Sequence, residues 1–381
     1  MRIIELFAGI GACSKALKRI GVNLEIIDAV EIDKYAMASF NAIHGTNFKT
    51  QDITEWNKDF KDIDLITHGS PCQDFSIAGK QAGGDIDSGT RSSLMYETIR
   101  IVGKIRPKYV LWENVKNLLS KKHKHNFDAY IETMNALGYN SYYQVLNAKD
   151  YGIPQNRERV YTISIRKDID NGSFKFPEKE ELKLRLKDML EDEVDEKYYL
   201  KDYQLENIKQ SNFMTNKRRI QEKEYSDTIL ARDWKDPKCV RTGGIFDTEK
   251  SKHQAGSIYD KEGLSPTLDI MQGGWRQPSI VERTPLKFLN RNQKNINGDY
   301  AFCVDSSNTG GVKEIENNNY RIRKLTPKEC WRLMGFSDED FDKAANIPTS
   351  NTQLYKQAGN SIVVNVLEKI FENLLGEMLW K

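Results

Sequence analysis

The sequence Gly69-Ser70-Pro71-Cys72-Gln73-Asp74-Phe75-Ser76 follows an apolar run, Ile63-Asp64-Leu65-Ile66-Thr67. The run predicts a short buried strand of a parallel sheet, and such sheets bind ligands beyond the carboxyl ends of their strands. A cysteine at that place, directly after a rigid proline, is a candidate nucleophile. A lone cysteine is also commonly a small buried residue that only packs. Residues elsewhere in the chain are needed to distinguish a nucleophile from a packing residue.

Strand-like and helix-like segments alternate on both sides of this stretch. Hydrophobic periodicity predicts strands near 2–7, 24–30, 63–67, 109–112, 141–146 and 160–165, and helices near 12–20, 35–40, 92–104 and 126–137. This alternation predicts an α/β fold with a doubly wound, Rossmann-like sheet. A last amphipathic helix is expected from Ser361 onward. Its apolar face needs a partner, most simply the first domain, so we expect that domain to comprise residues 1–177 plus 350–381.

The segment between these parts has a different composition. Residues 178–196 carry nine acidic and four basic residues, which indicates a solvated helix or connector. Residues 200–320 are rich in Gly, Asn and Asp and show poor periodicity, so we expect a loop-rich region of short strands. A helix is expected from Pro327, with Thr326 as its N-cap and Glu329 three residues later. Together these segments predict a smaller domain over 178–349.

Composition excludes several classes of protein. The 381 residues are 39% hydrophobic and 29% charged, and no apolar run is long enough to cross a membrane. The N-terminus has no signal-peptide layout, so a cytoplasmic protein without membrane contact is expected. The five cysteines form no C-x-x-C pair, so neither a disulfide framework nor a metal site is expected. The net charge of +2 neither demands nor excludes a nucleic-acid partner.

The first constellation of candidate site residues is the turn Glu5-Leu6-Phe7-Ala8-Gly9-Ile10-Gly11. Its glycines let the backbone approach a ligand closely, but Ser14 stands where a dinucleotide fingerprint needs a third glycine. Glu31 ends the second strand, where an acid can hold ribose hydroxyls, and Asp52 follows a possible third strand. An adenosine ligand without a pyrophosphate, such as S-adenosylmethionine (SAM), fits this set. The alternative is a plain strand–turn–helix whose glycines serve packing.

Two further constellations lie at the ends of strands of the expected sheet. Trp112-Glu113-Asn114-Val115 would bring Glu113 into one cleft with Cys72, although an acid at such a place can also be inert. Gln155-Asn156-Arg157-Glu158-Arg159-Val160-Tyr161 precedes a strand, and alternation would place Arg157 and Arg159 on one face. The alternative for the arginines is a solvated, ion-paired edge.

Six short strings in this order, FAGIG, GSPCQDFS, WENV, QNRERVY, KLTPKECWRLMGF and QAGNSIVVNV, resemble the bacterial and phage DNA (cytosine-5) methyltransferases. The resemblance covers about residues 1–167 and 321–375. It implies transfer of a methyl group from SAM to carbon 5 of a flipped cytosine in a specific duplex DNA sequence, within a restriction–modification system or a phage.

The resemblance also implies roles for individual residues. Cys72 would be the nucleophile and Glu113 a hydrogen-bonding acid at the base, with Arg159 as donor to the cytosine carbonyl and Arg157 and Gln155 in support. The cofactor would be bound by Phe7, Gly9, Gly11, Glu31, Asp52, Pro71, Leu94 and Asn360. DNA would contact Gln73, Ser76 and Thr267, the last within a Thr-Leu pair of the target-recognition region at about 200–320.

Partners and rival functions follow from the same resemblance. We expect a monomer that acts on double-stranded DNA and that has at most a cognate restriction endonuclease sharing its site, without a stable complex. The alternatives are a transfer RNA cytosine-5 methyltransferase and a non-catalytic module that binds SAM or DNA. The long divergent middle region disfavours the first, and the presence of Cys72, Glu113 and Arg159 disfavours the second. A NAD-dependent oxidoreductase does not explain Ser14 or Cys72, and the chain has no Pro-Pro pair typical of amino-methylating enzymes.

Overall fold

The computed structural model describes residues 1–71, 94–199 and 320–376, together with residues 241–244, 257–259, 265–266, 268, 279–283, 288–289 and 295–296. The candidate residues Cys72, Gln73, Ser76 and Thr267 lie outside these described residues.

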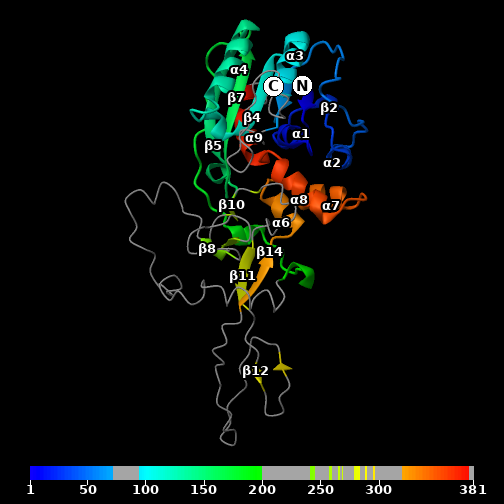
Figure 1. The fold of residues 1–381 in the computed structure, drawn as a ribbon, viewed down its shortest axis with the longest axis vertical. Coiled ribbons are helices and arrows are strands. Elements are labelled where there is room, and N and C mark those ends of the chain that lie inside the picture. The colour runs from blue at the N-terminus through cyan, green and yellow to red at the C-terminus, as the bar shows by residue number, and fades with distance from the viewer. Residues whose placement is uncertain are drawn as a thin grey trace, which may run out of the picture.

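A six-stranded sheet in the order β2-β1-β3-β4-β7-β5 forms the centre of the larger unit (Figure 1). Its strands are β1 (Arg2–Leu6), β2 (Glu25–Val30), β3 (Leu65–His68), β4 (Tyr109–Val115), β5 (Tyr139–Asn147) and β7 (Glu158–Arg166). The helices between them are α1 (Ala12–Arg19), α2 (Lys34–His44), α3 (Met95–Ile105) and α4 (Lys124–Ala136), with the 3₁₀ turn η2 (Lys116–Leu119) after β4. The expected doubly wound α/β fold is confirmed, and the six strands expected from hydrophobic periodicity are present.

The far end of the sheet is antiparallel. β7 runs antiparallel to both of its neighbours, β4 and β5. The segment between β5 and β7 holds only the 3₁₀ turn η3 (Ala148–Tyr151) and the two-residue strand β6 (Gln155–Asn156). A parallel crossover needs a dozen or more connecting residues and usually a helix, so this short link forces the chain to reverse. As a result, the start of β7 lies beside the end of β4.

Two expectations near the edges of the sheet are wrong. Residues 46–62 contain no strand, so Asp52 follows an irregular loop that is held to β2 by the Gln51 amide bonded to the Glu31 carbonyl at 2.9 Å. The last helix does not begin at Ser361. Helix α8 (Asn351–Asn360) ends there, residues 361–363 are extended, and α9 (Val364–Leu375) follows. Residues 361–363 form a linker instead, and Ser361 and Ile362 of this linker line the pocket described below.

Helices cover both faces of the sheet. α1 and α9 pack against each other, and their apolar residues share one core with β1, β7 and α6 (Pro327–Arg332). The opposite face packs against α3 and α4 around the buried Trp112 and Tyr130. α9 therefore finds its partner on the first domain, as expected from its apolar face. The ribbon shows α9 beside the N-terminal elements, although α9 follows them by more than 300 residues (Figure 1).

The middle segment connects this unit to short strands. Residues 178–196 form a connector with the 3₁₀ turn η4 (Leu186–Met189), and η5 (Glu196–Tyr198) follows it. A four-stranded sheet has the order β14-β11-β9-β8, and two short pairs join β10 to β6 and β12 to β13. The strands are β8 (Arg241–Gly244), β9 (Ser257–Tyr259), β10 (Ser265–Pro266), β11 (Ser279–Arg283), β12 (Phe288–Leu289), β13 (Asn295–Ile296) and β14 (Tyr320–Lys324).

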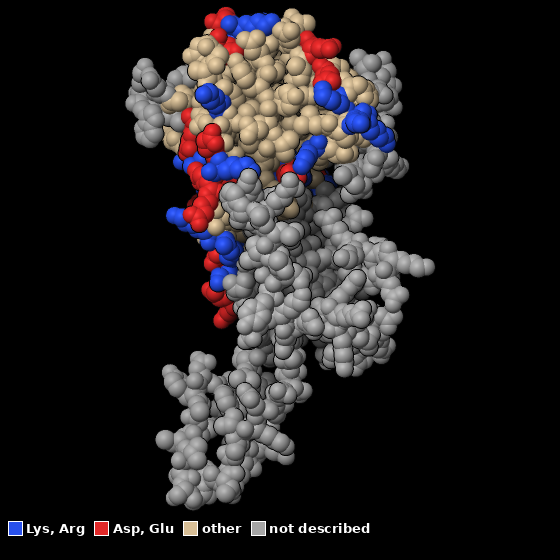
Figure 2. Space-filling view, turned by 90° about the vertical axis from the view of Figure 1, so that its left-hand side faces the viewer, with Lys and Arg blue, Asp and Glu red and all other residues tan. Residues whose placement is uncertain are grey.

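The segment after β14 returns to helices. Thr326 caps α6 in a capping box with Glu329, as expected, and α7 (Asp338–Ala345) packs against α2. Within the described residues no helix is long and apolar enough to cross a membrane. On the face drawn in Figure 2, charges of both signs surround a broad uncharged area of the described residues. The described part of this face therefore shows no continuous basic surface.

Candidate active site

The turn after β1 brings the backbone of Gly9 to the mouth of a pocket. Phe7, Gly9 and Gly11 all have positive φ angles, of 53°, 56° and 81°. A Cβ at Gly11 would lie 2.1 Å from Nε2 of His44, whereas a Cβ at Gly9 would meet nothing within 4 Å. Gly11 is therefore required for packing against α2. Gly9 leaves space in which a ligand can approach the backbone.

The buried carboxyl of Glu5 lies beneath this turn, and Ser14 holds it. The Ser14 amide donates to Oε1 of Glu5 at 3.0 Å, and the Ser14 hydroxyl donates to the same oxygen. Burial raises the pKa of the Glu5 carboxyl to about 7, although the bonds from Ser14 work in the opposite direction. This pair explains why serine replaces the third glycine of a dinucleotide fingerprint. No role was expected for Glu5, which begins the first constellation, because its only signal in the sequence is a carboxylate inside an apolar strand.

Glu31 directly follows β2, and its carboxylate binds the backbone of the turn after β1. Its carboxylate accepts the Gly9 amide at 2.9 Å and the Asp33 amide at 2.8 Å. Burial raises the pKa of Glu31, and these two backbone bonds oppose the rise. A carboxylate has about four acceptor positions, so two remain for ligand hydroxyls. Ile32, which the sequence analysis also missed, is 70% exposed beside it and presents a free apolar surface.

The neighbouring loop carries Asp52. The Asp52 carboxylate accepts both the amide and the hydroxyl of Thr54, and these bonds lower its pKa. The bond from the Gln51 amide to the Glu31 carbonyl keeps this loop at the end of β2. Glu31, Ile32 and Asp52 therefore lie on adjoining segments at one edge of the sheet.

The pocket is open to solvent, and the space between its walls and its mouth together amounts to about 430 Å³. Residues from β1 and its turn, β3, β4 and the end of α8 line it, namely Glu5–Ile10, Ala12, Cys13, Thr67–Gly69, Glu113 and Asn360–Ile362. The structure thus brings together Phe7, Gly9, Glu113 and Asn360 of the expected site residues. Leu94 does not line the pocket but packs, half-buried, against the core under α3.

The approach to Cys72 is anchored at Ser70. The Trp112 indole donates to the Ser70 hydroxyl at 3.0 Å, and the Asn114 amide donates to the Ser70 carbonyl at 3.3 Å. The two neighbours of Glu113 in the WENV string therefore fix the backbone two residues before Cys72. Pro71 follows Ser70 and is half-buried. Sequence reasoning missed these roles of Trp112 and Asn114, because a tertiary contact has no periodic signal.

Glu113 and Arg159 meet across the antiparallel ladder. Nε of Arg159 lies 3.1 Å from Oε1 of Glu113, and both side chains are largely buried. Burial raises the pKa of Glu113, while the charges of Arg159 and Arg157 oppose that rise. The other carboxylate oxygen, Oε2, would lie 3.7 Å from a Cβ at Gly69. The acid therefore faces Gly69, at the start of the segment that leads to Cys72.

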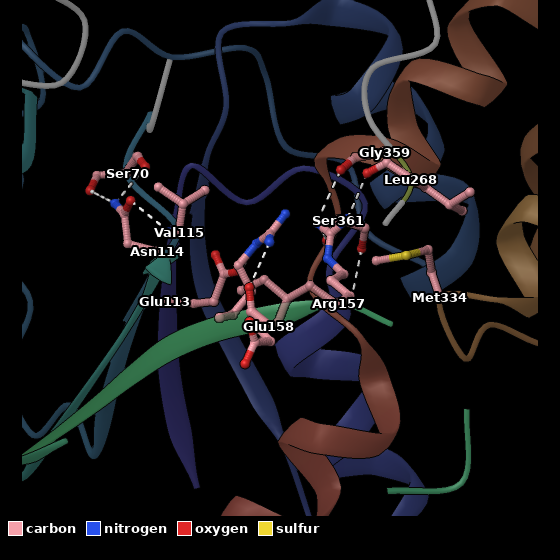
Figure 3. A network of polar contacts seen from close by, with 12 residues as sticks. Ser70, Glu113, Asn114, Val115, Arg157, Glu158, Leu268, Met334, Gly359 and Ser361 are labelled. Carbon is pink, nitrogen blue, oxygen red and sulfur yellow. Dashed lines mark hydrogen bonds and ion pairs between the residues drawn. The ribbon is translucent and has the colours of Figure 1, made fainter. Parts of the chain in front are cut away.

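The Arg157 side chain does not join the Glu113–Arg159 pair but points toward backbone carbonyls. Its guanidinium donates to the carbonyls of Leu268 at 2.8 Å, Gly359 at 3.1 Å and Ser361 at 2.9 Å (Figure 3). The expectation that Arg157 and Arg159 share one face is wrong, because Arg157 lies in the break between β6 and β7, where strand alternation does not apply. Within the described residues, no cluster of three or more His, Cys, Asp or Glu could hold a metal ion.

The sheet order, the ligand pocket at the strand ends and the buried acid–guanidinium pair define an α/β methyltransferase of the Rossmann-like class. Comparison with known proteins narrows this class. The model of the C-5 cytosine-specific DNA methylases matches residues 1–376, and the chain belongs to that family. It is a DNA (cytosine-5-)-methyltransferase.

Individual relatives agree with the family. The chain is 36% identical to the orphan methyltransferase M.SPBetaI of Bacillus phage SPbeta, over 98% of this chain and 97% of the relative. It is 34% identical to the type II methyltransferase M.HhaI of Haemophilus parahaemolyticus, over 100% of this chain and 96% of the relative. Among solved structures, the S. pombe Dnmt2 methyltransferase has a TM-score of 0.63 at 21% identity, with 99% of each chain covered, which supports the fold.

Proposed function

We propose that this chain methylates cytosine in duplex DNA with SAM as methyl donor, and that Cys72, Glu113 and Arg159 act on the base. The contact between Glu113 and Arg159 at 3.1 Å, beside the segment that leads to Cys72, is the observation that carries this proposal. A flipped base is required because a duplex hides carbon 5 of cytosine.

Each of the three residues has a distinct task. The Cys72 thiolate adds to carbon 6 of the ring and makes carbon 5 nucleophilic, and it leaves again after the carbon-5 proton is lost. Burial raises the pKa of Glu113, which favours the protonated acid that can donate to ring nitrogen 3 as charge develops there. Arg159 both orients Glu113 and offers guanidinium donors to the carbonyl oxygen of the base.

The pocket residues fit an adenosine cofactor. Glu31 retains acceptor positions for ribose hydroxyls, Ile32 offers an apolar surface for adenine, and Asp52 can accept the adenine amino group. Phe7, Gly9, Gly11, Pro71, Leu94 and Asn360 complete the proposed cofactor set, in which Gly11 acts through packing and Leu94 through the core. The buried Glu5 carboxyl faces the same pocket and suits a cationic ligand. SAM supplies the electrophilic methyl group.

Arg157 belongs to the site as a positioning residue, since three backbone carbonyls occupy its guanidinium. We further propose that residues 1–177 plus 350–381 form the catalytic domain and residues 178–349 a smaller domain, with target recognition at about 200–320. Thr267, Gln73 and Ser76 are proposed DNA contacts. The names of the relatives support a phage or restriction–modification setting, in which the protein works as a cytoplasmic monomer without a stable complex with any cognate endonuclease.

Methyl transfer from labelled SAM tests the proposal, with plasmid DNA and transfer RNA compared as acceptors. We expect label in duplex DNA only, and Cys72→Ser should abolish transfer while SAM binding stays within about twofold. Bisulfite sequencing of DNA from expressing cells then identifies the target. Label in transfer RNA alone, or full activity of Cys72→Ser, would refute the proposed substrate or the proposed nucleophile.

A further inference from the structure

Arg157 joins three chain segments that are far apart in sequence. It precedes β7 and reaches Leu268, more than 100 residues later, and Gly359 and Ser361, about 200 residues later. The side chain is buried, and Figure 3 shows it directed toward these three residues. Each acceptor is a backbone carbonyl, so the guanidinium fixes the course of the chain at each point.

The segment 265–268 is held at both ends by the same short stretch before β7. The Ser265 amide donates to the Pro154 carbonyl at 2.7 Å, and β10 pairs in parallel with β6. The Leu268 amide donates to Oε1 of Gln155 at 3.3 Å, while the Leu268 carbonyl accepts from Arg157. Gln155 is itself fixed, because its Nε2 donates to the Leu333 carbonyl at 2.8 Å.

The other two carbonyls flank a pocket residue. Gly359 and Ser361 lie on either side of Asn360, and Asn360, Ser361 and Ile362 all line the pocket. This linker is where α8 ends and α9 begins. Residues 361–363 lie between the two helices, and Arg157 bonds to the last turn of α8 at Gly359 and to the first linker residue at Ser361.

The geometry requires arginine. A guanidinium is planar and carries five donors, so it can serve three acceptors at fixed angles, whereas a lysine ammonium is a compact point charge on a flexible stem. The guanidinium charge also acts on Glu113, whose pKa it lowers against the effect of burial.

We propose that Arg157 holds the junction of α8 and the linker, at Gly359 and Ser361, and the recognition segment at Leu268 in one arrangement, so that SAM affinity and target selectivity depend on the same side chain. This inference rests on the proposed function, because it assumes that the pocket takes SAM and that residues near 267 meet DNA. Arg157 and Gln155 have different roles in this arrangement. Arg157 bonds to both segments, whereas Gln155 bonds to the recognition segment and not to the linker.

A double-mutant cycle on SAM affinity tests the first half. Arg157→Lys and Asn360→Ala are each expected to weaken SAM binding about tenfold, which corresponds to about 1.4 kcal/mol, the loss of one hydrogen bond. If Arg157 acts through the linker, the double variant binds no more weakly than about tenfold, because its effects are coupled. A hundredfold loss in the double variant overturns the inference. Arg166→Lys, which alters an exposed arginine of β7 paired with Asp168, is the matched control and should not change the affinity.

Bisulfite sequencing tests the second half. Arg157→Lys and Gln155→Met should both raise the share of methylated cytosines outside the parent's sequence context, by several-fold. Gln155→Met should do so with SAM affinity unchanged, so it remains informative even where Arg157→Lys folds poorly. An unchanged context in Gln155→Met overturns the role of the recognition segment. If the parent chain binds no SAM, the proposed function is refuted. If the parent binds SAM but the losses of SAM affinity in Arg157→Lys and Asn360→Ala multiply in the double variant, only the proposed role of Arg157 is refuted.

Discussion

Replacing Glu5 by glutamine is expected to change how the stability of the protein depends on pH. Burial raises the pKa of this carboxyl from 4.5 to about 7. The folded protein therefore binds the proton more tightly than the unfolded chain does. The stabilisation is complete below pH 4.5 and is lost as pH rises toward 7, above which the buried carboxylate is ionised.

The magnitude follows from the shift in pKa. A tenfold change in proton affinity corresponds to about 1.4 kcal/mol, so ionising Glu5 in the folded state costs about 3 kcal/mol. Glutamine has nearly the same shape, and its oxygen can still accept the amide and hydroxyl of Ser14. Because it cannot ionise, Glu5→Gln should remove that loss. The variant should gain about 3 kcal/mol relative to the parent between pH 5 and pH 8.

Urea unfolding at a series of pH values measures this difference. The free energies of unfolding of parent and variant are compared at each pH, so contributions from all other groups cancel. Glu25→Gln is a matched control, because Glu25 lies on the neighbouring strand β2 and its side chain is 65% exposed. Parallel curves for the parent and Glu5→Gln would refute the reasoning, since they would mean that Glu5 titrates alike in folded and unfolded chains.

Three further changes test other parts of the structure. Gly11→Ala forces a Cβ to within 2.1 Å of His44 at a φ of 81° and should destabilise by more than Gly21→Ala, which has a φ of 83° and open space; thermal unfolding of both variants isolates the clash, and equal losses would contradict it. Glu329→Gln breaks a pair with Arg323 in which both side chains are 0% exposed, and should cost about 3–5 kcal/mol in urea unfolding; Glu339→Gln at an exposed pair should change nothing measurable. Asn114→Ala removes a donor to Ser70 and should lower kcat about tenfold while the KM for SAM stays constant; a matching rise in that KM would count against this role.

The alternating pattern predicted the sheet because each strand and helix has its own local periodicity. It did not place Glu113 beside Arg159, because Arg159 lies at the start of β7 and reaches the end of β4 only through the reversal of that strand. The reversal of β7 was readable in hindsight, because the link between β5 and β7 holds no helix. The expectation of a doubly wound sheet gave no direction for β7, although a link without a crossover helix leaves only the antiparallel arrangement.

The wrong expectations share a physical cause. Arg157 was assigned by alternation, but it lies in the break between two strands, and its direction depends on carbonyls more than 100 residues away. The boundary at Ser361 was set by apolar spacing, yet bonds from Arg157 to Gly359 and Ser361 hold an extended linker there. The roles of Ser14 and Glu5 also arise from a contact between a strand and a helix. Contacts of this kind depend on the assembled fold and leave no periodic trace.

The packing of α9 on α1 has a consequence for synthesis of the protein. The ribosome makes α1 and the first strands more than 300 residues before α9, and the Asn360 edge of the pocket comes equally late. Until then α1 lacks its contact with α9, and the shared apolar core of the sheet, α1 and α9 remains incomplete. A nascent chain can therefore neither close this core nor complete the pocket that Asn360 lines. Synthesis order itself delays the onset of methylation until nearly the whole chain has been translated.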